Sequence, residues 1–254
     1  MERLHLGQPR EAVLAGWGIV ADGSKVLLHL APGTKEDTAS CRAFFHDMRR
    51  RGLGDPLLVV SDGAPGLIRA IEECFPRSAR QRCLVHKMRN LQAKVPETLW
   101  PEFKARAHAC YQAASPTLAR LLRDDVVATY EHDLPAAIAC LDDDFDACIA
   151  HLEFPVNHRR TIRSTNLLER QFVEERRRTK TIPHAFGERA VLKLMYAALI
   201  RGSRGWCRLR ITEFEQRQLQ ALRAELDRVH TERTASAAPT AAEHPTRLSS
   251  KART

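Results

Sequence analysis

Apolar and polar positions along the first thirty residues follow a pattern that predicts two β-strands. Apolar residues dominate the runs at 12–20 and 25–30, and Asp22-Gly23 lies between them. Asp-Gly between two such runs is a strong signal for a tight turn, because glycine accepts the positive φ that a short hairpin connection requires. We therefore predict an antiparallel hairpin near the start of the chain.

Helical and strand patterns then alternate up to residue 85. The helix predicted at 38–51 carries Phe44, Phe45 and Met48 on one face and ends in three arginines. Cations at that end suit the negative pole of the helix dipole. A short strand beginning at 57, a helix at 65–74 and a strand at 80–85 follow, and this alternation is typical of β-α-β units.

From residue 86 to about residue 152 the apolar positions have helical spacing, and four prolines divide the stretch. This pattern predicts an all-helical region. Helical spacing resumes at 166–178, 186–201 and 212–230. After residue 231 the chain is rich in Ala, Thr, Ser and Pro with few apolar residues, so a disordered tail is expected there.

Charge and composition narrow the class of protein. The 254 residues include 40 Lys and Arg against 31 Asp and Glu, a net charge of +9. This excess suits a polyanionic partner, although a merely soluble basic surface would give the same balance. Seven cysteines, an odd number, favour reduced thiols in a cytosolic protein. No apolar run reaches the roughly 18 residues of a membrane span, and the first residues lack the apolar core of a signal peptide. We expect a cytoplasmic protein that does not enter the membrane.

Asp62 is the first candidate for chemistry. The apolar run that starts at Leu57 ends in Ser61-Asp62-Gly63, directly before a predicted helix. In open α/β sheets this position, past the carboxyl end of a strand, is where ligands and metal ions are held. A structural alternative remains open, because Asp before Gly commonly forms a turn and Ser61 or Asp62 could cap the next helix.

Glu169 is the candidate for a second carboxylate. Asn166-x-x-Glu169 also fits a capping box, in which Glu169 would bond back to the backbone of Asn166. Glu169 and Arg176 nevertheless fall on the apolar arc of the predicted helix. That arc is marked by Leu168, Phe172 and Val173. A carboxylate that shares a metal ion with Asp62 would need to face inward, whereas a capping glutamate would not.

Three blocks, taken in order, resemble the mutator-type bacterial insertion-sequence transposases over residues from about 12 to about 200. The blocks are 57–71, then 81–96 with Cys83, His86 and Arg89-Asn90, and then 163–170. The resemblance implies an α/β, RNase H-like (retroviral-integrase-like) fold, in which helices flank a mixed sheet and an all-helical insertion precedes the last catalytic helix. It divides the chain into a partial RNase H-like core at 1–86, the insertion at 87–160, the catalytic and C-terminal helices at 161–230, and a disordered tail at 231–254.

The resemblance also implies a function. Such transposases cut and join DNA with an Asp, Asp and Glu (DDE) site that holds Mg²⁺ or Mn²⁺, and Asp62 and Glu169 match the second and third of these acids. The implied partner is double-stranded DNA, as transposon ends and as target, with homo-oligomerisation of the full-length protein and a nucleoid-associated location. Arg176 takes the place of a residue that contacts DNA near the scissile phosphate. The surrounding basic segment is expected to contact phosphates through Arg163, Arg177 and Arg178, although a solvated helix face would look the same.

One expected acid is missing. By resemblance the first Asp belongs on a strand before residues 12–20, and this chain begins there. Glu2, Glu11 and Asp22 are the only acids nearby, and none has the required strand context. We therefore expect the C-terminal portion of a transposase, in a truncated copy whose activity is in doubt. The alternatives are a non-catalytic DNA-binding remnant or regulator of transposition and, less favoured by the helical insertion, an RNase H-like nuclease unrelated to transposition.

Two Cys-x-x-His pairs suggest a further alternative. Cys83 with His86 and Cys148 with His151 could form a Cys₂His₂ zinc site if the pairs met. The first pair also matches a motif of these transposases. In that interpretation Cys83 is a buried strand residue, and His86 packs or forms a hydrogen bond beside the active site.

Overall fold

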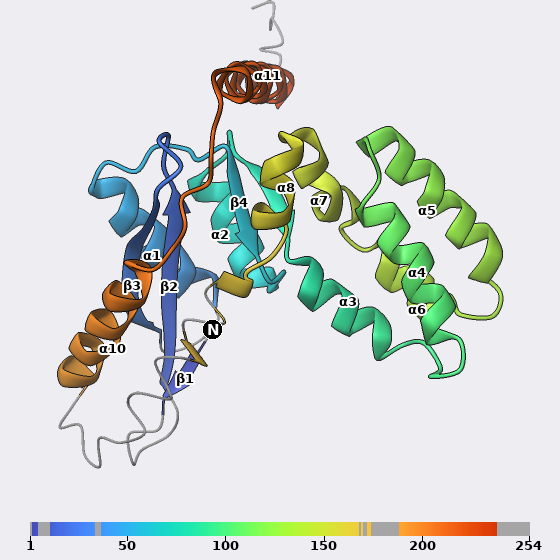
Figure 1. Ribbon diagram of the computed structural model, residues 1–254, viewed down its shortest axis with the longest axis horizontal. Helices are drawn as coiled ribbons and strands as arrows, with labels where there is room; N and C mark the ends of the chain where they lie inside the picture. The colour runs from blue at the N-terminus through green and yellow to red at the C-terminus, as the bar shows by residue number, and fades with distance from the viewer. Residues whose placement is uncertain are drawn as a thin grey trace, which may run out of the picture.

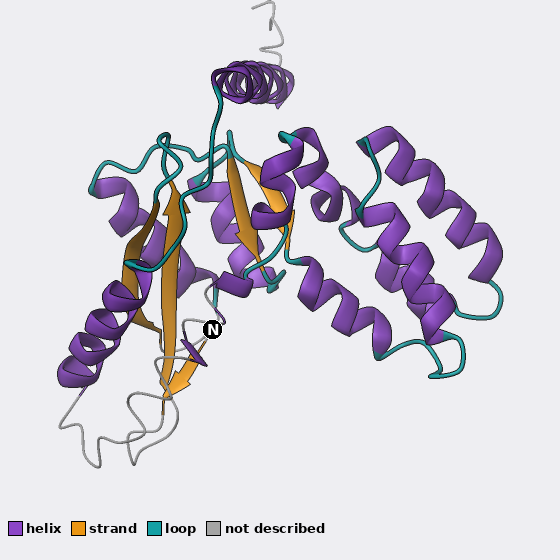
Figure 2. Ribbon diagram, viewed as in Figure 1, coloured by secondary structure: helices purple, strands orange, loops and turns teal. Residues whose placement is uncertain are grey.

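The computed structural model describes residues 2–4, 11–33, 37–167, 169, 172–173 and 188–237. It is a mixed α/β structure in which two small sheets lie among helices and a larger helical part extends to one side (Figure 1, Figure 2). The mixed α/β class expected from the sequence is therefore confirmed in this coarse form.

The first sheet contains the predicted hairpin. Strands β1 (Glu2–Leu4), β2 (Glu11–Ile19) and β3 (Lys25–Gly33) are antiparallel and lie in that order. The Asp22 carboxylate accepts hydrogen bonds from the amide and the hydroxyl of Ser24, at 2.8 and 2.9 Å, and thereby closes the turn. The turn needs Gly23, because its φ is +79° and a Cβ there would lie 1.8 Å from the carbonyl oxygen of Leu209.

The second sheet is the predicted β-α-β unit. Strands β4 (Leu58–Ser61) and β5 (Ala79–Arg82) are parallel and are joined through α2 (Pro65–Cys74). The strand predicted at 80–85 was too long, and the placement of Cys83 inside it was wrong. The Cys83 amide still donates to the Ser61 carbonyl at 2.7 Å, but the Leu84 amide donates to the Arg163 carbonyl and a helix begins.

Helices cover both faces of the sheets. Buried residues of α1 (Thr38–Arg50) pack against α2 and reach β2, β3 and β4 through Leu14, Leu28 and Val59. On the other face, Met195 and Leu199 of α10 (Glu188–Ser203) pack against Val13 of β2. Between the sheets, however, no strand of the described chain pairs β2 with β4.

The strand-free region forms the helical part seen on one side of Figure 1. Its elements are α3 (Leu84–Gln92), α4 (Trp100–Tyr111), α5 (Pro116–Tyr130), α6 (Pro135–Asp142), α7 (Phe145–Ile149), the 3₁₀ helix η1 (Ala150–Glu153) and α8 (Val156–Ile162). Pro116 and Pro135 are the first residues of α5 and α6, where proline costs no hydrogen bond. All of these helices except α8 contribute buried side chains to one continuous core.

The last described element is the long helix α11 (Glu213–Ala237). It continues past residue 231, so the start of the disordered tail was predicted too early and residues 231–237 are helical. Residues 238–254 lie outside the described residues. Among the described helices, none combines the length and the apolarity needed to cross a bilayer.

Candidate metal-binding site

Asp62 lies directly after β4, where the backbone turns toward α2. One of its carboxylate oxygens accepts a hydrogen bond from the Ala64 amide at 3.2 Å. The N-cap residue of α2 is Ala64, so neither Ser61 nor Asp62 caps that helix. Gly63 has a φ of +92°, and a Cβ there would lie 2.6 Å from Nε of Arg82. The turn interpretation is therefore correct locally, and the same turn holds the half-buried Asp62 at the end of the strand.

Glu169 lies in a helix that follows Thr165. Its amide donates to the Thr165 carbonyl at 3.3 Å, and the Thr165 hydroxyl lies 3.1 Å from Glu169 Oε1. The capping box was wrong in detail, because the helix begins at Asn166 and Glu169 contacts the Thr165 side chain four residues back. Phe172 is buried as expected, but Val173 is 57% exposed, so the buried face is narrower than the predicted arc.

His86 lies beside Glu169, and the charge of Asp62 also influences it. Its Nδ1 is 3.8 Å from Glu169 Oε1 and has no hydrogen-bond partner although the atom is buried. Interaction with the neighbouring Cys83 side chain raises the pKa of His86, burial opposes that rise, and the negative charges of Cys83, Glu169 and Asp62 add to it. Arg89, one turn further along α3, places its guanidinium 3.7 Å from Glu169 Oε2.

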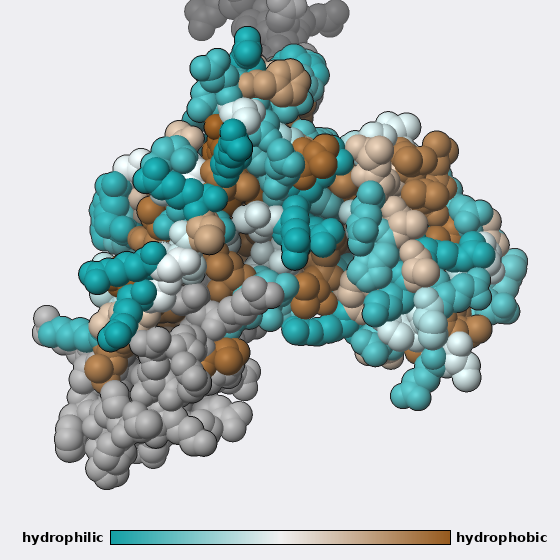
Figure 3. Space-filling view, viewed as in Figure 1, coloured by the Kyte–Doolittle hydropathy of each residue, from teal (hydrophilic) through white to brown (hydrophobic). Residues whose placement is uncertain are grey.

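A cleft of about 1090 Å³ connects these residues. Residues of β2 form one wall of the cleft, and residues 57–61 form another. Asp62, His86, Glu169 and Thr165 also line the cleft. Most of the lining is apolar, and Asp62 and Glu169 are its only acids among the described residues. Figure 3 shows hydrophobic side chains at the surface near the centre of this face. The structure thus brings the two sequence-predicted acids to one cleft.

Cys83 is buried at the start of α3. Its Sγ accepts hydrogen bonds from the amide and the hydroxyl of Thr165, both at 3.3 Å. Burial would raise the pKa of Cys83, but interaction with the His86 side chain and the hydrogen bonds from Thr165 outweigh burial and lower it to about 7. The sequence interpretation of Cys83 as buried was right, and His86 lies beside one of the two acids, Glu169.

The Cys₂His₂ alternative is wrong for the second pair. His151 Nε2 is 3.0 Å from the Tyr111 carbonyl and Nδ1 is 3.1 Å from Gln81 Oε1, so both ring nitrogens face protein oxygens, and His151 is not grouped with Cys83 and His86. In the described part of the chain, the one group of three or more His, Cys and carboxylate side chains close enough together to share an ion is Cys83, His86 and Glu169, and Cys148 does not belong to it.

The described residues include only part of the basic segment that was expected to contact DNA. Arg163 is half-buried at the end of α8, and its carbonyl accepts the Leu84 amide. Arg159 donates to the carbonyls of Ala114, Leu152 and Phe154, so its role is structural. Arg176, Arg177 and Arg178 lie outside the described residues, and their contact with DNA stays a prediction.

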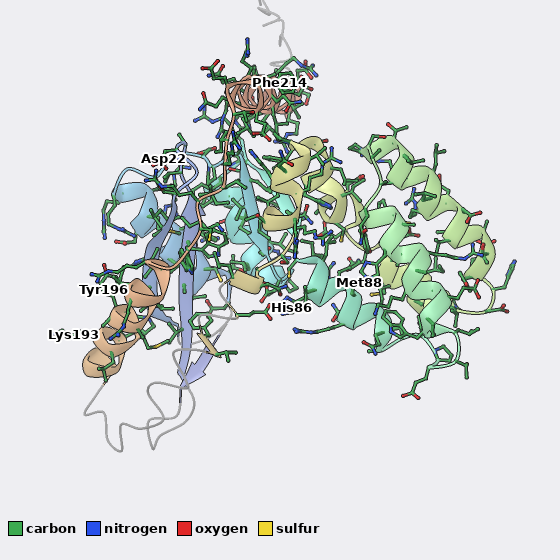
Figure 4. The ribbon with its side chains drawn as sticks, viewed as in Figure 1. Asp22, His86, Met88, Lys193, Tyr196 and Phe214 are labelled. Atoms are coloured by element: carbon green, nitrogen blue, oxygen red, sulfur yellow. The ribbon has the colours of Figure 1, made fainter. Side chains whose placement is uncertain are left out.

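The structure also shows where the three acids lie that were considered as the first Asp of the DDE site. Asp22 is in the hairpin turn, where its partners are Ser24 and, at 3.3 Å, Arg208. Figure 4 shows Asp22 well away from His86, so Asp22 does not complete the site. Glu2 and Glu11 belong to β1 and β2, which corrects the expectation that they lack a strand context.

Comparison with known proteins agrees with the resemblance seen in the sequence. The family described as "Transposase, Mutator family" matches residues 5–208, most of the chain. The chain belongs to this family. This transposase is 33% identical over 199 residues to the transposase of insertion sequence element IST2 of Acidithiobacillus ferrooxidans, covering 78% of this chain and 67% of the relative.

Two further relatives have similar descriptions. The transposase of insertion sequence element IS6120 of Mycolicibacterium smegmatis is 30% identical over 80% of this chain and 63% of its own length. That of IS1081 of Mycobacterium tuberculosis is 34% identical over 76% of this chain and 46% of its own length. The transposase described here therefore spans about half to two thirds of the length of these relatives.

Sequence reasoning assigned no role to two residues that touch Glu169. Thr165 immediately precedes the helix that carries Glu169, and Arg89 is three positions from His86 on one helix face. Both lie inside the sequence blocks that carry the resemblance. The signal was present, but the pairing of α3 with the segment at 163–169 is a tertiary contact that no local pattern encodes.

Proposed function

We propose that this chain is the part of an insertion-sequence transposase that contributes Asp62 and Glu169 to a DDE site for metal-dependent DNA cleavage and strand transfer. The observation that carries the proposal is that both acids lie along one cleft, with His86 influenced by the charge of each. Double-stranded DNA is the proposed substrate, and an RNase H-like fold is the proposed architecture.

The residues present fit a hard divalent cation. Mg²⁺ is held in proteins by one or two carboxylates together with substrate phosphates, and the cleft offers two carboxylates. When bound, such ions activate the attacking water or 3′-hydroxyl and stabilise the leaving oxygen. The chain's own residues prepare the ligands, because the Ala64 amide orients Asp62 and the Thr165 hydroxyl orients Glu169.

Arg89 fits a role in binding the DNA backbone. Its side chain is 61% exposed, and its guanidinium lies 3.7 Å from the Glu169 carboxylate. A phosphate that reached the cation at Glu169 would therefore come within reach of Arg89. Exposed arginines beside a metal site are suited to positioning phosphates without reading the base sequence.

The missing carboxylate belongs, in this proposal, on a strand between β2 and β4. Beyond the short contact with β1, the edge of β2 away from β3 is unpaired in the described chain, and so is the edge of β4 away from β5. Both edges border the cleft. A strand there would join the sheets in the order β3-β2-strand-β4-β5, and if it ran parallel to β4 its carboxyl end would lie beside Asp62.

An extension of the chain tests this proposal. The DNA upstream of the Met1 codon is translated, and any segment encoding a short apolar strand that ends in Asp is added to the protein. We expect the extended protein to nick supercoiled DNA with Mg²⁺ or Mn²⁺, and Asp62→Asn and Glu169→Gln to abolish nicking. Nicking that survives either substitution would contradict the role of that acid.

A second function is favoured by the composition of the cleft lining. Because only two acids line the cleft in the described residues, the 254-residue chain could bind DNA through its basic surface without cutting it. Such a remnant or regulator would shift DNA in a binding assay but would not nick it with either metal ion. The nicking assay on the extended protein therefore separates the two functions, because a remnant or regulator would not nick DNA even with the added strand.

A further inference from the structure

Cys83, His86 and Glu169 form a cluster whose chemistry a DDE site does not use. One ligand atom from each, a thiol sulfur, an imidazole nitrogen and a carboxylate oxygen, lies within 4.8 Å of the other two. Cys83 and His86 come from the start of α3, whereas Glu169 comes from the helix after Thr165. Tertiary packing therefore brings the three side chains together, because they come from two segments that are far apart in the sequence.

Each member presents a ligand atom. Cys83 Sγ accepts two hydrogen bonds from Thr165, an arrangement that stabilises the thiolate form required of a metal ligand. His86 Nδ1 is buried without a hydrogen-bond partner, and it is this nitrogen that lies 3.8 Å from Glu169 Oε1. Tetrahedral zinc sites with bonds of about 2.0 to 2.3 Å place their ligand atoms roughly 3.5 Å apart, so small side-chain rotations would close the site.

We propose that Cys83, His86 and Glu169 form a binding site for a soft divalent cation such as Zn²⁺, overlapping the Asp62–Glu169 pair. Thiolate and imidazole select Zn²⁺ over Mg²⁺, whereas two carboxylates favour the harder ion. Three protein ligands leave a fourth zinc position open to water.

Because Glu169 belongs to both sites, the two cations should compete for it. Glu169 cannot be fully engaged with Zn²⁺ on the Cys83 side and with Mg²⁺ on the Asp62 side at once. Zn²⁺ should therefore displace the hard cation and act as an inhibitor. This consequence rests on the proposed function, whereas the soft-cation site itself does not.

Cobalt(II) absorption tests the site on the full chain, kept reduced. Co²⁺ replaces Zn²⁺ in tetrahedral sites, and a cysteine ligand gives an intense thiolate-to-cobalt charge-transfer band. We expect this band in the wild type, its loss in Cys83→Ser, and Co²⁺ affinity lower by on the order of a hundredfold in His86→Ala and Glu169→Gln. Cys207→Ser, which removes an exposed thiol, is the control and should keep the band.

The outcomes separate this site from the proposed function. A wild type without the band, a band that persists in Cys83→Ser, or one that is lost in Cys207→Ser would overturn the site. Because Cys83 is buried, unfolding of Cys83→Ser is checked by circular dichroism, and the half-exposed Glu169→Gln carries the test if that variant fails to fold. Asp62→Asn should keep the cobalt band but lose Mn²⁺ binding, so failure of either site is visible by itself.

Discussion

The helical part of this transposase, residues 84–162, has a continuous buried core, whereas its sheet part is divided by a cleft. In the helical part, side chains from successive helices meet in one continuous core that includes Phe103, Leu141 and Ile149. Gln81 of β5 joins this core, because its side chain donates to the Cys148 carbonyl and accepts a hydrogen bond from the His151 amide. The sheet part has two separate strand groups with an apolar cleft between them.

The closed core of the helical part contributes stability, whereas the candidate site lies in the cleft of the sheet part. The helical part has a continuous core of its own and is tied to β5 by the ion pairs Arg80–Asp144 and Arg82–Asp143. The sheet part leaves unpaired strand edges, which in proteins invite pairing with a further strand. The candidate site lies along that open edge and not in the closed core. We infer that the packing of α3 into the helical core fixes the positions of His86 and Arg89 beside Glu169.

The largest expected effect is on stability and compares the two parts directly. Phe103→Ala in the closed core should lower the free energy of unfolding by about 3–5 kcal/mol, because the removed ring leaves a buried cavity. Ile19→Ala, at the half-buried cleft wall, should cost roughly 1–2 kcal/mol, since its side chain is already partly in water. Urea unfolding measures both. Equal losses would show that the cleft wall is as well packed as the helical core.

The next effect is a pH dependence that belongs to the helical part. Burial lowers the pKa of His151 to about 4 from 6.5. Between those pH values the unfolded chain binds more protons than the folded one, so stability is full above pH 6.5 and falls as pH drops toward 4. The loss from this residue should reach about 3 kcal/mol. His151→Gln should flatten the curve and the exposed His132→Gln should not, and matching curves for wild type and His151→Gln would refute the assignment.

A pair of glycines tests how tightly the turn at Asp62 is built. Gly63 and Gly52 have φ values of +92° and +98°, but only at Gly63 would a Cβ strike a neighbour, Arg82. Both alanine variants should be strained, and Gly63→Ala should cost about 1–2 kcal/mol more because Arg82 must shift. It should also weaken Mn²⁺ binding, which Gly52→Ala should leave unchanged. A smaller effect for Gly63→Ala would mean that Arg82 moves freely.

The smallest effect concerns the basic segment outside the described residues. Binding to duplex DNA should be weak, independent of sequence and steeply dependent on salt, because neutralised phosphates release counterions. Replacing Arg176, Arg177 and Arg178 together with Ala should flatten the slope of log K against log salt by up to ~3. An unchanged slope would identify the segment as a solvated helix face.

Local patterns predicted the hairpin, α1 and the β4-α2-β5 unit well, because turns, amphipathic faces and strand-ending glycines act within a few residues. The boundary after β5 was missed for a tertiary reason. Leu84 and Val85 are apolar and looked like more strand, but the Leu84 amide finds its acceptor at Arg163, eighty residues away along the chain.

The sequence predicted the two acids of the candidate site separately, but it did not predict how they are arranged in space. Asp62 follows from the end of a strand and Glu169 from its predicted inward-facing position, yet neither pattern says that both acids line one cleft or that His86 lies beside Glu169. Thr165 and Arg89 were overlooked because their contacts with Glu169 depend on how α3 packs against the following segment. The resemblance to transposases supplied the pairing that physical patterning could not.

We propose that Asp62 and Glu169 share one divalent cation. A double-mutant cycle on Mn²⁺ binding, followed by electron paramagnetic resonance, tests it most directly. The wild type should bind Mn²⁺ weakly, Asp62→Asn and Glu169→Gln should each lower the affinity at least tenfold, roughly 1.4 kcal/mol, and the double variant should be little worse than either single one. Losses that add fully, or an affinity that neither substitution changes, would show that the two carboxylates do not share an ion.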